Sequence, residues 1–146
     1  MTAPVLVFGW GNPSRGDDAL GPLLIERIDA LQLPGVECLT DFQLQVEHAL
    51  DLENRRRILF VDASLNADTP FSVTRLQAAR DASFTTHAMT PEAVMHVYVE
   101  LHDEPPPPCT LLAIRGERFE LGEEVSPAAA SHLDAALAWA KAWLAD

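Results

Sequence analysis

A glycine-rich segment directly after a short apolar run constrains the fold of this chain more than any other part of its sequence. The apolar run is Val5 to Phe8, and the segment after it reads Gly9-Trp10-Gly11-Asn12-Pro13-Ser14-Arg15-Gly16-Asp17-Asp18-Ala19-Leu20-Gly21-Pro22. Such a run is typical of a strand that is buried on both faces of a parallel sheet, and Leu23 to Leu33 has the pattern of a helix. The segment is therefore predicted to be a strand-to-helix crossover at the carboxyl edge of an α/β sheet, where ligands bind.

The two adjacent acids of this crossover favour a cation over a phosphate group. Glycine-rich turns of this kind commonly bind phosphate. Here, however, Ser14 stands where the dinucleotide fingerprint has glycine, and no Gly-Lys-Ser/Thr follows. Asp17 and Asp18 would repel a phosphate unless a cation lay between them. One alternative stays open: either carboxylate merely caps the helix, with Pro22 in the first turn.

The remaining sequence continues the alternation of strands and helices that is typical of a doubly wound α/β protein. The alternating pattern of Phe71 to Leu76 predicts a half-buried edge strand, which we expect to be antiparallel because the connection before it is too short for a crossover helix. Residues 103–108 contain four consecutive prolines and predict an extended connector. Further strands are expected at residues 35–39, 58–61 and 110–114, and helices at 44–52, 91–101 and 127–144.

Composition limits the class of protein and its partners. The length of 146 residues, with 48% hydrophobic and 22% charged, predicts one globular domain over residues 1–146. The net charge of -12 opposes binding to nucleic acid or to an anionic membrane, both of which need cationic patches. The sequence has no secretory signal and no apolar run of membrane-spanning length. Cys38 and Cys109 resemble buried thiols rather than a disulfide framework. These observations predict a cytoplasmic protein.

Three polar residues are expected to meet at the carboxyl edge of a doubly wound sheet. Asp18 lies in the first crossover, Asp62 leaves the third strand, and His87 lies in the loop before the helix at residues 91–101. Two carboxylates and one imidazole form a ligand set for a divalent ion and leave coordination positions for substrate or water. Without a metal, the two carboxylates are able to share a proton as a general acid/base pair. Alternatively, Asp62 caps a turn and His87 is an ordinary loop histidine.

Other chemical signals in the sequence are weaker. No Gly-x-Ser-x-Gly elbow and no His-Glu-x-x-His helix is present, which argues against the standard serine and zinc hydrolases. Four further histidines have no obvious partnering carboxylate at the sheet edge and are expected to be structural or solvated. They are His48, His96, His102 and His132.

Three segments, in this order, resemble the hydrogenase maturation proteases. The first is Gly9-x-Gly11-Asn12-Pro13-x-x-Gly16-Asp17-Asp18-x-x-Gly21-Pro22, which is long and specific. The second is Phe60-Val61-Asp62-Ala63 and the third is Thr86-His87-x-Met89. Members of this family are endopeptidases, often classed as aspartic-type, that trim a C-terminal extension from the large subunit of nickel-iron hydrogenases. The resemblance implies a three-layer α/β/α sandwich around a mostly parallel, twisted, five-stranded sheet.

The resemblance also assigns roles to individual residues. It implies that Asp18, Asp62 and His87 hold a metal, and that this metal is the nickel carried by the client, the hydrogenase large-subunit precursor. It implies no nucleotide cofactor. Asp18 stands where some relatives carry glutamate, so the ion is expected nearer the helix start. Asp17 either orients the loop or assists as a second carboxylate. Arg15 either contacts the client's tail or is an exposed loop cation.

A further motif suggests a branch of the family, and the proposed ligands also fit two other functions. Trp10 and the run Asp41-Phe42-Gln43-Leu44-Gln45 resemble the branch of the family that serves soluble, NAD-linked hydrogenases. A non-catalytic assembly chaperone that recognises a nickel-loaded partner would need the same ligands. A metal-dependent phosphoesterase would need a phosphate cradle, which an acidic loop supplies poorly.

Overall fold

The computed structural model describes residues 2–80 and 89–146 of the chain. In these residues, five strands form one sheet in the order β2-β1-β3-β5-β4. Three α-helices and two 3₁₀ turns accompany it. The strands are β1 (Val5–Trp10), β2 (Val36–Asp41), β3 (Arg57–Ser64), β4 (Phe71–Arg75) and β5 (Cys109–Arg115). The helices are α1 (Leu20–Asp29), α2 (Pro91–His102) and α3 (Pro127–Ala145), and the turns are η1 (Gly16–Ala19) and η2 (Val46–Leu52).

The pairing of the strands confirms the predicted mixed sheet. Strand β1 pairs in parallel with β2 on one side and with β3 on the other, and β3 pairs in parallel with β5. Strand β4 pairs only with β5, antiparallel, at the sheet edge. Because the chain leaves β1 for β2 on one side and returns to β3 on the other, the sheet has a switch point between β1 and β3. Ligands of doubly wound proteins bind at such a point.

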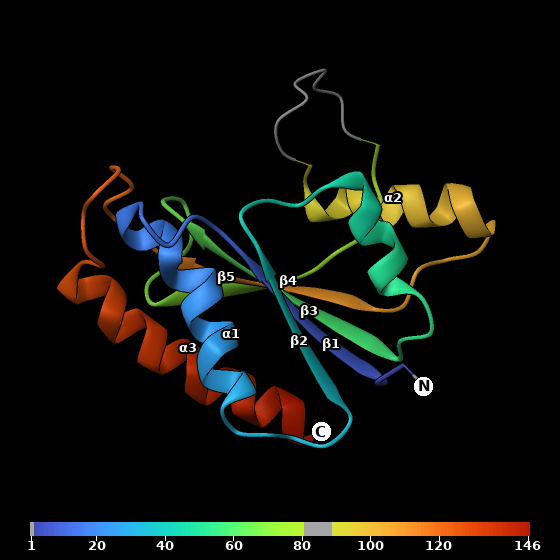
Figure 1. Cartoon of the computed structure of the whole chain (residues 1–146), viewed down its shortest axis with the longest axis horizontal. Helices are drawn as coiled ribbons and strands as arrows, with labels where there is room; N and C mark the ends of the chain where they lie inside the picture. The colour runs from blue at the N-terminus through green and yellow to red at the C-terminus, as the bar shows by residue number, and fades with distance from the viewer. Residues whose placement is uncertain (1, 81–88) are drawn as a thin grey trace.

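Helices cover both faces of the sheet and make three layers (Figure 1). Helices α1 and α3 lie on one face, whereas α2 and η2 lie on the other. Successive strand residues point to opposite faces. Accordingly, Val7 and Leu59 pack in the core beneath α1 and α3, whereas Phe8 and Phe60 pack beneath α2 and η2. These four side chains are almost wholly buried. The expected α/β/α fold is therefore confirmed.

Two helical segments differ from the sequence-based expectation, and α1 differs at both ends, since it stops at Asp29 rather than Leu33. Helix α1 begins at Leu20 rather than Leu23, because η1 continues directly into it: Leu20 already has helical backbone angles, with φ -59° and ψ -41°. Pro22 is tolerated in the first turn, where its missing N–H is not needed. The expected helix at residues 44–52 is a 3₁₀ turn that starts at Val46. Leu44 is buried ahead of that turn, and Nδ1 of His48 accepts the backbone N–H of Gln45 at its start.

Aromatic side chains pack along the C-terminal helix α3. Trp139 and Trp143 stack on each other with their ring centroids 6.5 Å apart, and the guanidinium of Arg57 lies 3.9 Å from the centroid of the Trp143 ring. Within residues 2–80 and 89–146, none of the helices combines the length and the apolar character needed to cross a membrane.

Candidate functional site

Asp18 lies in η1, at the carboxyl end of β1, and its carboxylate faces back onto the crossover. Its Oδ2 atom accepts a hydrogen bond of 2.7 Å from the backbone N–H of Asn12, and the side chain is half-buried. Neither η1 nor α1 has a side-chain capping hydrogen bond. Helix capping therefore does not explain Asp17 or Asp18.

Two glycines set the distance between α1 and the sheet beside Asp18. A Cβ atom on Gly9 would lie 2.7 Å from the carbonyl oxygen of Gly21, and a Cβ atom on Gly21 would lie 2.5 Å from the carbonyl oxygen of Trp10. Backbone therefore touches backbone at this crossing. Gly9 is also the register partner of Val61 in β3, the residue before Asp62. This close approach carries the start of α1, and Asp18 with it, toward the end of β3.

Asp62 lies near the carboxyl end of β3, and its ionisation is disfavoured. Burial of the carboxyl group raises its pKa to about 7, the N–H of Ala63 lowers it, and the negative charge of Asp18 raises it further. The Ala63 N–H donates to Oδ1 over 2.8 Å. The structure thus brings Asp18 and Asp62 close enough for their charges to interact. With a pKa of about 7, the Asp62 carboxyl is able both to hold and to release a proton near neutral pH.

The third predicted ligand, His87, lies outside the described residues. Within residues 2–80 and 89–146, no group of three or more His, Cys, Asp or Glu side chains is arranged to hold a metal. The structure brings Asp18 and Asp62 together, whereas metal binding by this pair and the role of His87 stay predictions. Met89, the first described residue after the gap, donates its N–H to the carbonyl of Leu44 over 3.2 Å, next to the carboxyl end of β2.

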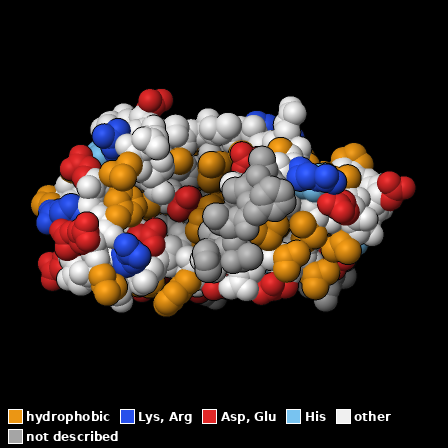
Figure 2. All heavy atoms as spheres, turned by 90° about the horizontal axis from the view of Figure 1, so that it is seen from above, with side chains coloured by type: hydrophobic (Ala, Val, Ile, Leu, Met, Phe, Trp, Pro, Cys, Tyr) orange, Lys and Arg blue, Asp and Glu red, His pale blue; other side chains and the backbone are white. Residues whose placement is uncertain are grey.

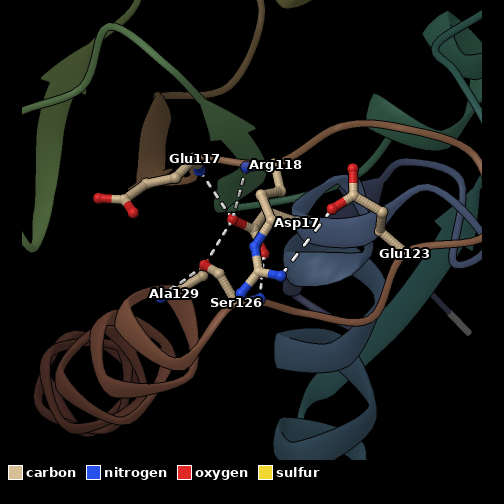
Figure 3. Close-up of polar contacts among 6 residues, drawn as sticks. All are labelled: Asp17, Glu117, Arg118, Glu123, Ser126 and Ala129. Carbon is tan, nitrogen blue, oxygen red and sulfur yellow. Dashed lines mark hydrogen bonds and ion pairs between the residues drawn. The ribbon is translucent and has the colours of Figure 1, made fainter.

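Asp17 differs completely from its neighbour Asp18, because its side chain is fully buried. Its carboxylate accepts four hydrogen bonds (Figure 3). Burial alone would raise the pKa of Asp17, but these hydrogen bonds outweigh it and lower the pKa. Of the two roles expected for Asp17, the structure supports orienting the loop. The donors are the N–H groups of Glu117 (2.7 Å), Arg118 (3.0 Å) and Ser126 (2.7 Å), and the Ser126 hydroxyl (2.8 Å).

Arg15 lies at the surface of the same crossover. Its Nε atom donates to the carbonyl of Phe119 over 3.2 Å, and the residue is exposed. The guanidinium is therefore attached to the loop between β5 and α3, with its remaining donors accessible to a partner.

A histidine–carboxylate pair at the sheet edge was missed by the sequence analysis. His48 was expected to have no partnering carboxylate there, but its Nε2 atom lies 3.1 Å from Oδ2 of Asp41, the last residue of β2. Its Nδ1 atom accepts from the N–H of Gln45 over 2.8 Å, so the ring proton is on Nε2. The sequence gave no signal for this pair, because Asp41 ends a strand and His48 lies in a separate 3₁₀ turn, so no single periodicity relates them. This pair fixes η2 against β2.

Large hydrophobic side chains are exposed in the segments that follow three of the parallel strands. Phe42, which follows β2, is 66% exposed; Leu65, which follows β3, is 54% exposed; and Leu121, in the loop after β5, is 73% exposed. On the face of the molecule that Figure 2 shows, hydrophobic side chains form groups with acidic and basic ones between them. Exposed apolar groups around a polar site are typical of a surface that binds another protein.

Comparison with known proteins gives matches at the level of structure. No protein-family model matches the chain, and no curated protein sequence matches it. The fold is similar to that of the [NiFe] hydrogenase maturation protease HycI from Thermococcus kodakarensis KOD1, with a TM-score of 0.76 and 20% identity over 99% of this chain and 94% of the other. The hydrogenase maturating endopeptidase HybD from E. coli has a TM-score of 0.73 and 23% identity, over 99% of this chain and 92% of the other. An endopeptidase from Escherichia coli has a TM-score of 0.70 and 25% identity, over 97% of this chain and 91% of the other.

Proposed function

We propose that this chain is an endopeptidase that removes the C-terminal extension of a nickel-loaded [NiFe] hydrogenase large-subunit precursor and so completes its maturation. The observation that carries the proposal is the interaction of Asp18 with Asp62 at the switch point of the sheet. The fold around this pair is similar over almost the whole chain to solved proteins described as hydrogenase maturation proteases. The motif residues therefore coincide with an acidic site on a fold that these proteases use.

In this proposal the nickel belongs to the substrate. Asp18, Asp62 and His87 hold the ion that the client carries, and the protein needs no resident metal or nucleotide. Each carboxylate uses one oxygen to accept a backbone N–H, from Asn12 or Ala63, which leaves its other oxygen for the ion. Carboxylate and imidazole are suitable ligands for a divalent nickel ion. Cleavage then depends on whether the client is loaded.

Binding of the ion positions the scissile peptide beside the acidic pair. Holding the peptide there removes the entropy cost of orienting it. A carboxylate of the pair takes a proton from the attacking water and passes it to the leaving amine, as a general base and then a general acid. The pKa of Asp62 is about 7 without an ion, so the positive charge of the client's nickel would leave this carboxylate ionised and able to accept a proton at neutral pH.

The exposed hydrophobic side chains that follow the parallel strands support a folded protein as the substrate. Phe42, Leu65 and Leu121 are exposed apolar side chains of the kind that protein partners cover. We also propose that the client belongs to the soluble, NAD-linked hydrogenases, and that processing takes place in the cytoplasm. The motif that suggests this branch includes Phe42. This side chain is exposed, whereas Leu44 is buried and Asp41 is paired with His48.

A direct test is to mix the purified protein with precursor large subunit, either nickel-loaded or nickel-free, and to weigh the products by mass spectrometry. We expect a mass loss at the C-terminus of the loaded form only, and no cleavage of unrelated unfolded peptides. A stable complex without any mass loss would favour the assembly-chaperone alternative. Efficient cleavage of generic peptides would contradict the requirement for the client's nickel.

A further inference from the structure

The crossover that carries Asp18 is bonded to a loop about a hundred residues further along the chain. Three backbone hydrogen bonds join residues 14–17 to the loop at residues 116–126, between β5 and α3. They run from the N–H of Gly16 to the carbonyl of Glu123 (3.1 Å), from Asp17 to Arg118 (2.6 Å), and from Gly122 to Ser14 (2.7 Å). We call this contact the η1 junction.

The carboxylate of Asp17 lies at the centre of the η1 junction (Figure 3). An ionised carboxylate only accepts hydrogen bonds. Here its Oδ2 atom accepts from the N–H groups of Glu117 and Arg118 and from the Ser126 hydroxyl, and its Oδ1 atom accepts the Ser126 N–H. The Ser126 hydroxyl also accepts the N–H of Ala129 and so caps α3. One side chain therefore joins η1, the end of β5 and the start of α3.

The loop held by Asp17 is also fixed from its other side. The N–H of Gly116 donates to the carbonyl of Ser64 at the end of β3, over 3.1 Å. The Nδ1 atom of His132 in α3 donates to the carbonyl of Arg115, over 2.9 Å. The loop thus connects η1, which carries Asp18, to the end of β3, which carries Asp62.

We propose that Asp17 is a positioning residue for Asp18: its buried carboxylate fixes η1 against the β5–α3 loop and thereby sets where the Asp18 carboxylate lies relative to Asp62. Asp18 follows Asp17 directly in the same 3₁₀ turn. Asp18 itself has only the Asn12 N–H as a hydrogen-bond donor to its carboxylate among the described residues. Its placement therefore depends on the turn, and the turn depends on Asp17. The consequence for catalysis rests on the proposed function, whereas the consequence for the position of Asp18 does not.

The test compares Asp17→Asn with Ile28→Val, a destabilising change in the buried part of α1 far along the helix from η1. Asparagine keeps the shape but presents an amide N–H₂ to groups that are themselves donors. Two quantities are measured on folded protein. One is hydrogen exchange of the Asn12 amide, which reports on its bond to Asp18. The other is kcat and KM for precursor cleavage.

We expect Asp17→Asn to speed Asn12 exchange at least tenfold and to lower kcat by about 10- to 100-fold, the range found when groups that orient metal ligands are removed. Ile28→Val should leave both at wild-type values. Unchanged Asn12 exchange in folded Asp17→Asn would overturn the proposal, whether or not cleavage falls. If wild-type protein does not cleave the precursor, the proposed function fails, and Asn12 exchange still decides the role of Asp17.

A second pair of variants applies if Asp17→Asn does not fold. Ser126→Ala removes one donor to Asp17 together with the cap of α3, whereas Thr90→Ala removes only the equivalent cap of α2, where Thr90 accepts the N–H of Ala93. We expect faster Asn12 exchange in Ser126→Ala than in Thr90→Ala. Equal exchange in the two variants would overturn the proposal.

Discussion

The η1 junction and the open end of β3 each hold an aspartate that is largely removed from water, yet they shift its pKa in opposite directions. In the junction, four donors surround Asp17 and lower its pKa. At the end of β3, Asp62 has one backbone donor and a second carboxylate nearby, and its pKa rises to about 7. The number of donors, rather than burial alone, therefore decides which carboxylate is charged. The protein uses the same functional group as a fixed structural anchor in one region and as a proton-holding group in the other.

The largest expected effect is on activity at the end of β3. Asp62→Asn keeps the size of the side chain but removes the ionisable group, so precursor cleavage should fall by about 10²- to 10⁴-fold, which is the usual contribution of a general acid/base. Cleavage is followed by mass spectrometry of the precursor. Circular dichroism serves as the control for folding, and a folded variant that cleaves at the wild-type rate would remove Asp62 from the site.

Removing the anchor of the η1 junction should produce the largest loss of stability. Asp17→Ala leaves several buried donors without an acceptor, and each unsatisfied group costs about 1–3 kcal/mol. We expect the free energy of unfolding to fall by about 3 kcal/mol or more, measured by urea denaturation. Asp134→Asn, at an exposed ion pair with Arg27, is the matched control and should change it by less than about 1 kcal/mol.

The pH dependence of stability should have opposite signs in the two regions. Because the pKa of Asp62 is raised from 3.8 to about 7, the folded protein binds more protons than the unfolded chain between these values. The contribution of Asp62 to stability is complete below pH 4 and is lost as the pH rises through 7, at about 1.4 kcal/mol per pKa unit. The contribution of Asp17 is present above pH 4 and is lost as the pH falls through its lowered pKa.

Urea denaturation at pH 5 and pH 8 measures the Asp62 contribution. Wild-type protein should lose stability between these pH values relative to Asp62→Asn, which has no proton to release. Parallel changes in the two proteins would mean that Asp62 is not protonated in the folded state near neutral pH.

Substitutions at two glycines of the η1 junction allow the cost of backbone strain to be measured apart from the cost of a steric clash. Gly16 has φ +54°, and a Cβ atom there would lie 2.5 Å from the carbonyl oxygen of Arg118; Gly122 has φ +87° but no atom within 4 Å of such a Cβ. Gly122→Ala should cost about 1 kcal/mol through strain alone. Gly16→Ala should cost at least twice that, because the junction must also open. Equal losses of stability for the two variants, measured by thermal unfolding, would show that the junction opens at little cost.

The smallest expected effect concerns Arg15, the exposed contact of the junction. Arg15→Ala should lower stability by less than about 1 kcal/mol, because its bond to Phe119 is in contact with water. If Arg15 contacts the client, KM for precursor cleavage should rise while kcat stays unchanged. No change in KM would leave Arg15 as a loop cation only.

The sequence predicts what is local and periodic, and it misses what is not. The apolar runs of β1 and β3 and the alternation of β4 predicted the sheet, and chain order placed Asp18 and Asp62 at one edge. Asp17 and Asp18 are identical residue types side by side, so nothing local separates them. Their roles differ because the donors to Asp17 come from residues 117–126, a pairing that only the folded chain creates.

The contact between Gly9 and Gly21 has a consequence for how far such sequences diverge. The spacing between α1 and the sheet is set there by peptide groups, whose dimensions are the same in every protein. Side-chain packing changes as homologous sequences drift apart, and helices shift on their sheets as a result. A contact between two backbone segments does not depend on side-chain packing, as long as both positions remain glycine. In this chain the crossing fixes the height of α1 above the sheet, and with it the start of the helix beside the turn that carries Asp18.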